Sequence, residues 1–218
     1  MNYSHAFFDL DGTLTDSAPG ITHSVQYALR KLGITPPPAE ELTVFVGPPL
    51  TQSFSKYFGL NEVESRVAVD FYRQYYRAGG MLECKLYDGI RDLLEALRRA
   101  DVTCVLATCK PHEFARRILA HFEIDSYFSF VSGPEMDGTR GEKHEVIAYA
   151  MQQLGLQEPS RILMIGDRDS DVLGARANGI RGVGVLWGFG SEKELREVHA
   201  DAICASPAEL QRLILGTR

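Results

Sequence analysis

Short apolar runs and helical hydrophobic periodicities alternate along the chain from about residue 86 onward. The runs Val102–Thr108 and Arg161–Ile165 have the continuous apolar character of buried strands. Such alternation predicts a parallel α/β sheet. The expected strands are 102–108, 128–131, 161–165, 181–186 and one near Ile203, and the expected helices are 90–97, 114–122, 146–154, 169–178, 191–199 and a final helix.

Residues 16–85 have a different pattern, in which helical spacing dominates. An amphipathic helix beginning near Ile21 is stopped by Gly33 and the run Pro36–Pro38. Helices are also expected at 50–58 and 61–77, and no strand is expected. The apolar run 6–10 therefore belongs with the later α/β part. We predict a Rossmann-like parallel sheet core with helices on both faces, formed by residues 1–15 and 86–218, and a small all-helical cap domain, residues 16–85, inserted after the first strand.

Composition narrows the class of protein. The 218 residues are 44% hydrophobic and 24% charged, as in ordinary globular proteins, and the net charge of −6 argues against binding a nucleic acid polymer or an anionic membrane. No apolar run reaches the ~18 residues that span a bilayer, and no signal peptide is expected. The four cysteines lack metal-ligand spacing. A cytoplasmic enzyme or binding protein, monomer or homodimer, is expected.

Two carboxylates follow the first apolar run directly. Asp9 and Asp11 stand two positions apart, so in an extended segment their side chains point the same way. This arrangement indicates catalysis or metal binding. A turn or helix N-cap is the structural alternative, because Asp-Gly is also an ordinary turn signal.

Other polar residues follow the later predicted strands. Thr108 ends one strand, Asp167 and Asp171 follow another, and Lys143 opens the preceding helix. Ligands bind beyond the carboxyl ends of the strands in open parallel sheets. Converging carboxylates raise one another's pKa unless a cation balances them, and hard oxygen ligands favour Mg²⁺. A threonine hydroxyl and a lysine suit a phosphoryl group, which one N-terminal acid can attack while the other transfers a proton.

These motifs resemble the haloacid dehalogenase superfamily of phosphohydrolases. The run Asp9–Thr13 is similar to its first motif, Thr108 to its second, Lys143 to its third and Gly166–Asp171 to its fourth. The resemblance implies an aspartyl-phosphate mechanism in which Asp9 is the nucleophile and Asp11 the general acid/base. It also implies a Mg²⁺ site. The implied metal ligands are Asp9, Asp11 through its backbone carbonyl, Asp167, and Asp171, which binds through water or acts as a support.

The implied phosphate-binding residues surround this acidic cluster. They are Gly12, Thr13, Thr108, Cys109 and Lys143, and Lys143 also offsets the charge of Asp9. Cys109 departs from the Ser or Asn that is usual after the motif threonine, and a neighbouring helix N-terminus could lower its thiol pKa. Arg140 competes with Lys143 for the role of the basic residue, and Asp171 also suits a helix surface.

Within the superfamily, the phosphoglycolate phosphatase-like branch is the most similar in the motifs Asp9–Ser17, Gly47–Leu50, Tyr87–Ile90 and Gly166–Arg168. The predicted function is Mg²⁺-dependent hydrolysis of a small phosphorylated metabolite. The alternatives are a 5′-nucleotidase or a pyrophosphatase on the same core, a β-phosphoglucomutase-like phosphomutase, and a non-catalytic binding module.

Overall fold

The chain divides into two compact units. The structure, a computed structural model, describes residues 3–216. One unit comprises the chain up to Thr15 together with the chain from Leu86 onward, and the other comprises Asp16–Lys85. The chain passes between them at two short strands, β2 (Thr15–Asp16) and β3 (Lys85–Leu86), which pair with each other.

The first unit is built on a six-stranded parallel sheet with the order β5-β4-β1-β6-β7-β8. The central strand β1 is short and wholly apolar after its first residue, as expected for a strand covered on both faces. The strands are β1 (His5–Phe8), β4 (Thr103–Ala107), β5 (Phe128–Ser132), β6 (Ile162–Gly166), β7 (Arg181–Val185) and β8 (Ala202–Cys204).

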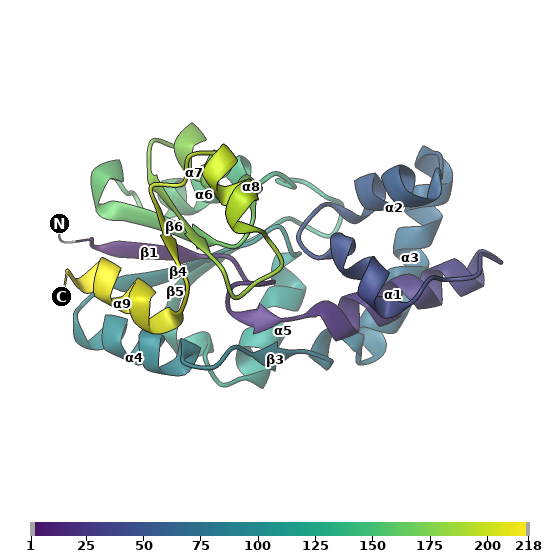
Figure 1. Cartoon of the computed structure of the whole chain (residues 1–218), viewed down its shortest axis with the longest axis horizontal. Helices are drawn as coiled ribbons and strands as arrows, with labels where there is room; N and C mark the ends of the chain where they lie inside the picture. The colour runs from purple at the N-terminus through teal and green to yellow at the C-terminus, as the bar shows by residue number, and fades with distance from the viewer. Residues whose placement is uncertain (1–2, 217–218) are drawn as a thin grey trace. The chain divides into compact units, whose positions relative to one another are not determined.

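Helices cover both faces of this sheet, as Figure 1 shows. Helices α6 and α7 pack against one face, and α4 and α9 pack together on the other. The α/β fold class predicted from the sequence is therefore confirmed. The helices are α4 (Ile90–Arg99), α5 (His112–His121), α6 (Lys143–Gln153), α7 (Asp169–Ala177), α8 (Glu192–Glu197) and α9 (Pro207–Leu215), with short 3-10 helices η3 (Asp125–Tyr127) and η4 (Pro159–Arg161).

A continuous apolar core joins the sheet to α6 and α7. Phe7 at the centre of β1 packs with residues of β4, β6 and both helices, and every member is at most 5% exposed. Such dense packing fixes the ends of β1, β4 and β6 relative to one another. The cluster comprises Phe7, Val105, Ala107, Val146, Ile147, Ala150, Ile162, Met164, Ala175 and Ile180.

The second unit is helical. Helix α1 packs against α3 and against the 3-10 helix η1, and α2 also packs against α3. A reciprocal capping box fixes the start of α3, where the Asn61 side chain accepts from Glu64 N and the Glu64 side chain accepts from Asn61 N. The elements are α1 (Ala18–Lys31), η1 (Ala39–Phe45), α2 (Leu50–Phe58), α3 (Glu62–Ala78) and η2 (Gly80–Leu82).

The structure differs from the sequence-based expectation at a few short elements. No strand was expected between residues 16 and 85, yet β2 and β3 each place one residue there. The 3-10 helix η1 was also not expected. Two-residue strands carry too few positions for a hydrophobic period to reveal them, and the seven residues of η1 make only about two 3-10 turns. Among residues 3–216, no helix has both the length and the apolar character needed to cross a membrane.

Candidate active site

The neighbouring strands β4, β1 and β6 end at the same edge of the sheet. The residues that follow them are Thr108 after β4, Asp9 and Asp11 after β1, and Asp167 after β6. All four side chains are buried, with Asp11 the most exposed at 8%. Strand order thus brings together polar residues that are up to 158 positions apart.

Lys143 is the cation at the centre of this group. Its Nζ lies 2.9 Å from Asp9 Oδ1 and 2.8 Å from Asp171 Oδ1, and it donates to the Ala107 carbonyl at 3.0 Å. The lysine is 4% exposed and is the first residue of α6. Arg140, the competing basic residue, instead pairs with Glu135 at 2.5 Å and stacks on Tyr149.

The pKa values of the site residues are shifted by burial and by the neighbouring charges. Burial, reinforced by the charges of Asp171 and Asp9, raises the pKa of Asp167 to about 7. Burial also raises the pKa of Asp171, although its ion pair with Lys143 opposes the shift. Burial by itself would lower the pKa of Lys143, but the charges of Asp171 and Asp9 outweigh it and raise that pKa. Lys143 therefore does not by itself balance the negative charge of the neighbouring carboxylates.

A metal ion fits this shortage. One carboxylate oxygen from each of Asp9, Asp167 and Asp171 lies within 4.8 Å of the others. Asp167 Oδ1 is buried and, among the described residues, has no hydrogen-bond partner. A buried carboxylate oxygen without a donor is costly unless a cation binds it. An all-oxygen donor set suits Mg²⁺.

Asp11 has its own buried partner. Lys110 Nζ lies 2.9 Å from Asp11 Oδ1, and the two side chains are 5% and 10% exposed. Lys110 is not among the site residues predicted from the sequence. Its position two residues after Thr108, at the end of β4, was the available signal.

Gly12 and Thr13 form the tight turn after Asp11. Gly12 has φ +79°, and a Cβ atom there would lie 2.3 Å from Asp167 Oδ2. Only glycine meets both conditions. Thr13 is fully buried, and its carbonyl accepts a hydrogen bond of 2.9 Å from Trp187 Nε1.

Thr108 and Cys109 begin the loop after β4. The Thr108 hydroxyl accepts from Lys110 N at 3.2 Å, which closes a local turn. Burial raises the pKa of the Cys109 thiol to about 12, and Lys143 opposes the shift only in part. The suggestion that the pKa of this thiol is lowered is therefore wrong, because burial removes the hydration of the thiolate.

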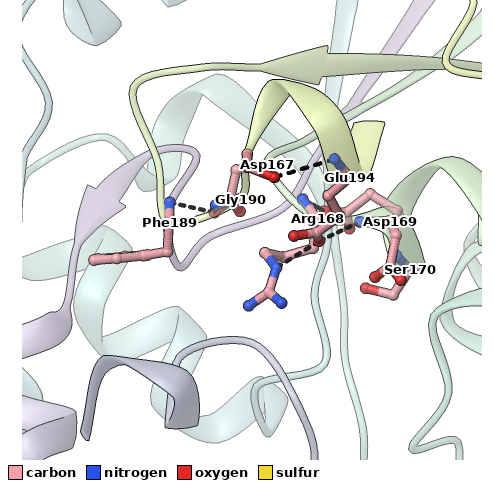
Figure 2. Close-up of polar contacts among 9 residues, drawn as sticks. Asp167, Arg168, Asp169, Ser170, Phe189, Gly190 and Glu194 are labelled. Atoms are coloured by element: carbon pink, nitrogen blue, oxygen red, sulfur yellow. Dashed lines mark hydrogen bonds and ion pairs between the residues drawn. The ribbon is translucent and has the colours of Figure 1, made fainter. Parts of the chain in front are cut away.

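A loop between β7 and α8 also reaches the site, and none of its residues was predicted as a site residue from the sequence. The backbone N–H groups of Phe189 and Gly190 donate to Asp167 Oδ2 at 2.8 and 3.3 Å. Figure 2 shows these bonds beside Arg168, Asp169 and Glu194. The glycines of Trp187–Gly190 were the only signal, since they permit close backbone approach.

Comparison with known proteins agrees with this geometry. Residues 6–185 match the family described as haloacid dehalogenase-like hydrolase. The chain belongs to this family. Its phosphatase class is supported by a 5′-nucleotidase of Pseudomonas aeruginosa that is 45% identical over 214 residues, which are 98% of this chain and 96% of the relative.

Two further relatives of this haloacid dehalogenase-like hydrolase support the same conclusion. A phosphoglycolate phosphatase of Pseudomonas fluorescens is 30% identical, over 96% of this chain and 78% of its own length. The crystal structure of a predicted phosphatase from Clostridium acetobutylicum superimposes with a TM-score of 0.95 at 45% identity, covering 99% of this chain and all of that one. The superfamily resemblance and the phosphatase class predicted from the sequence are confirmed.

Proposed function

We propose that the chain is a Mg²⁺-dependent phosphatase that hydrolyses a small phosphomonoester through an aspartyl-phosphate on Asp9. The observation that carries this proposal is the convergence of Asp9, Asp167 and Lys143 at the ends of β1 and β6 and the start of α6. Oδ1 of Asp167, which has no hydrogen-bond partner within residues 3–216, supports the metal requirement.

Asp9, Asp167 and Asp171 are the residues proposed to hold Mg²⁺, together with the backbone carbonyl of Asp11. When bound, the ion would neutralise charge on the transferring phosphoryl group. Both Asp171 oxygens already have partners, Lys143 Nζ at 2.8 Å and Arg168 N at 3.1 Å. We therefore expect Asp171 to interact with Mg²⁺ through a water molecule.

The chain's own residues carry the proposed steps. A carboxylate oxygen of Asp9 attacks phosphorus, the ester P–O bond breaks, and the departing oxygen takes a proton from Asp11. Asp11 then removes a proton from water, whose oxygen attacks the phosphorus and releases phosphate from Asp9. Lys143 holds Asp9 in place, Lys110 holds Asp11, and Thr108, Cys109, Gly12 and Thr13 are proposed to line the phosphate position.

The substrate proposed first is a nucleoside 5′-monophosphate. The 5′-nucleotidase relative is 45% identical along nearly the whole chain, whereas the phosphoglycolate phosphatase relative is 30% identical. The motifs of the sequence favoured the phosphoglycolate phosphatase-like branch over the 5′-nucleotidase alternative, so this ranking reverses that order. We propose that residues 16–85 act as a cap that selects the substrate, and that the protein works in the cytoplasm.

The nucleophile is tested by Asp9→Asn, which keeps the size of the side chain and removes the attacking charge. Phosphate release from p-nitrophenyl phosphate should fall by about 10³-fold or more while circular dichroism stays unchanged. The matched control is Asp92→Asn in the first turn of α4, which should keep full activity. Full activity of Asp9→Asn, or of the wild type in EDTA, would contradict the mechanism.

The substrate is tested by phosphate release from nucleoside 5′-monophosphates, phosphoglycolate, sugar phosphates and pyrophosphate at equal concentrations. The highest kcat/KM is expected for a nucleotide. A higher kcat/KM for phosphoglycolate would overturn the ranking without affecting the mechanism. Turnover of a sugar phosphate that requires a sugar bisphosphate and releases no free phosphate would indicate a phosphomutase.

A further inference from the structure

The two oxygens of Asp167 have different surroundings. Oδ2 accepts from the backbone N–H groups of Phe189 and Gly190, at 2.8 and 3.3 Å. Oδ1 is buried and has no hydrogen-bond partner among the described residues. The loop before α8 therefore fixes one oxygen and leaves the other for a cation.

That loop lies very close to the end of β6. A Cβ atom at Gly190 would lie 1.7 Å from the carbonyl oxygen of Asp167. The chain after β7 therefore packs directly on the backbone of the residue whose carboxylate it orients. The position of this loop relative to β6 therefore sets where its two N–H groups meet the Asp167 carboxylate.

A second contact joins the same two segments. Glu194 Oε1 on α8 accepts from Arg168 Nε at 2.8 Å and from Asp169 N at 3.0 Å (Figure 2). These are the two residues that follow Asp167. Both charged side chains are about one quarter exposed, so the pair is more sheltered from water than an ordinary surface pair.

The ion pairs that the structure shows for Glu192 and Lys193, the neighbours of Glu194, stay within α8. Glu192 accepts from Arg196 one turn along the same helix, and Lys193 pairs with Glu197 in the same way. Such exposed pairs along one helix contribute little to stability. Glu192 is thus a matched control for Glu194.

We propose that Glu194 is a positioning residue for the metal-binding carboxylate of Asp167. Its carboxylate binds Arg168 and Asp169, the two residues that follow Asp167, while the loop leading into α8 binds Asp167 Oδ2. The Asp167 carboxylate and the backbone that follows it are therefore both held by the chain at 189–194. Without Glu194, the Asp169 amide and the Arg168 Nε–H group both lose the carboxylate oxygen that accepts from them. This inference rests on the proposed Mg²⁺ site.

The test is direct Mg²⁺ binding by isothermal titration calorimetry of the whole chain without substrate. Glu194→Ala should weaken Mg²⁺ binding by about tenfold or more, as removal of residues that orient metal ligands does. Glu194→Gln keeps an oxygen for the Asp169 amide and should weaken it less. Glu192→Ala should stay within about twofold of the wild type, since surface substitutions have small effects.

The outcomes separate the two proposals. No Mg²⁺ binding by the wild type would overturn the metal site and, with it, the role of Glu194. Wild-type binding together with unchanged affinity in Glu194→Ala would overturn only the role of Glu194. If Glu194→Ala does not fold, Mg²⁺ binding is measured with the isosteric Glu194→Gln in its place. Equal Mg²⁺ affinity in Glu194→Gln, in Glu192→Ala and in the wild type would then overturn the proposal.

Discussion

Lys143 connects the charges of the site at the scale of single residues. Its ammonium group has three N–H donors, and Asp9, Asp171 and the Ala107 carbonyl accept all three within 3.0 Å. In this arrangement its effect on a bound phosphate is through charge and through the placement of Asp9. We therefore expect this buried ammonium to stabilise the folded structure as well as to support hydrolysis.

The first prediction concerns Lys143→Met, which keeps the length of the side chain and removes its charge. Removing one partner of a buried ion pair leaves the other charge uncompensated, so the free energy of unfolding should fall by about 3–5 kcal/mol. Urea unfolding at neutral pH measures this. Hydrolysis should also be lost, because Asp9 is no longer held.

The control for this substitution is Lys193→Met on α8, where an exposed lysine pairs with Glu197 at 3.8 Å. Its free energy of unfolding should stay within about 0.5 kcal/mol of the wild type. If Lys143→Met unfolds at the same urea concentration as the control, Asp9 and Asp171 do not depend on Lys143.

At the scale of elements, two of the buried carboxylates follow the end of β6. Asp167 lies directly after the strand, and Asp171 lies in the first turn of α7. Burial, together with the charges of Asp171 and Asp9, raises the pKa of Asp167 to about 7. In an unfolded chain the pKa of aspartate is about 3.9.

The second prediction is a pH dependence of stability in EDTA. Between about pH 4 and 7 the folded protein holds a proton at Asp167 that the unfolded chain has lost, so stability falls as pH rises through this range. The loss from this one group is at most about 4 kcal/mol. Asp167→Asn cannot ionise, so its stability should fall less steeply. Urea unfolding at about pH 5 and about pH 7.5 compares the two proteins; equal pH slopes would refute this origin.

Sequence patterns predicted the long elements of the core well. The strand expected at 161–165 is β6, and the helix expected at 169–178 is α7. Residues in one strand or helix share a period that a single sequence displays. The same periodicity is what makes an apolar core between β1 and α6 foreseeable.

The contacts that complete the candidate site were not predictable in this way. Phe189 reaches Asp167 across 22 residues, and Glu194 reaches Arg168 across 26. No local pattern encodes a hydrogen bond between segments that meet only after the sheet has formed. The resemblance of motifs pointed to Asp9, Asp167 and Lys143, whose roles stay predictions, but it said nothing of the loop at 187–190.

At the scale of the whole molecule, the acidic site belongs to a chain whose net charge is −6. Lys143 pairs with Asp9 and Asp171 but balances only part of the charge of the three buried carboxylates, whose oxygens lie within 4.8 Å of one another, so their repulsion opposes folding unless a further cation binds. A ligand that binds only the folded state stabilises it by an amount set by its concentration and dissociation constant. Mg²⁺ is therefore expected to act on the stability of the fold as well as on turnover.

The last prediction is that Mg²⁺ raises the Tm of the wild type at neutral pH. At a hundredfold excess over its dissociation constant it should stabilise the fold by about 2.7 kcal/mol, a Tm increase of about 5–10 °C for a chain of this size. NaCl at equal ionic strength should give little change. The increase should shrink near pH 5, because protons compete at Asp167, and should be lost in Asp167→Asn. A Tm that responds equally to MgCl₂ and NaCl would show that the three carboxylates form no Mg²⁺ site.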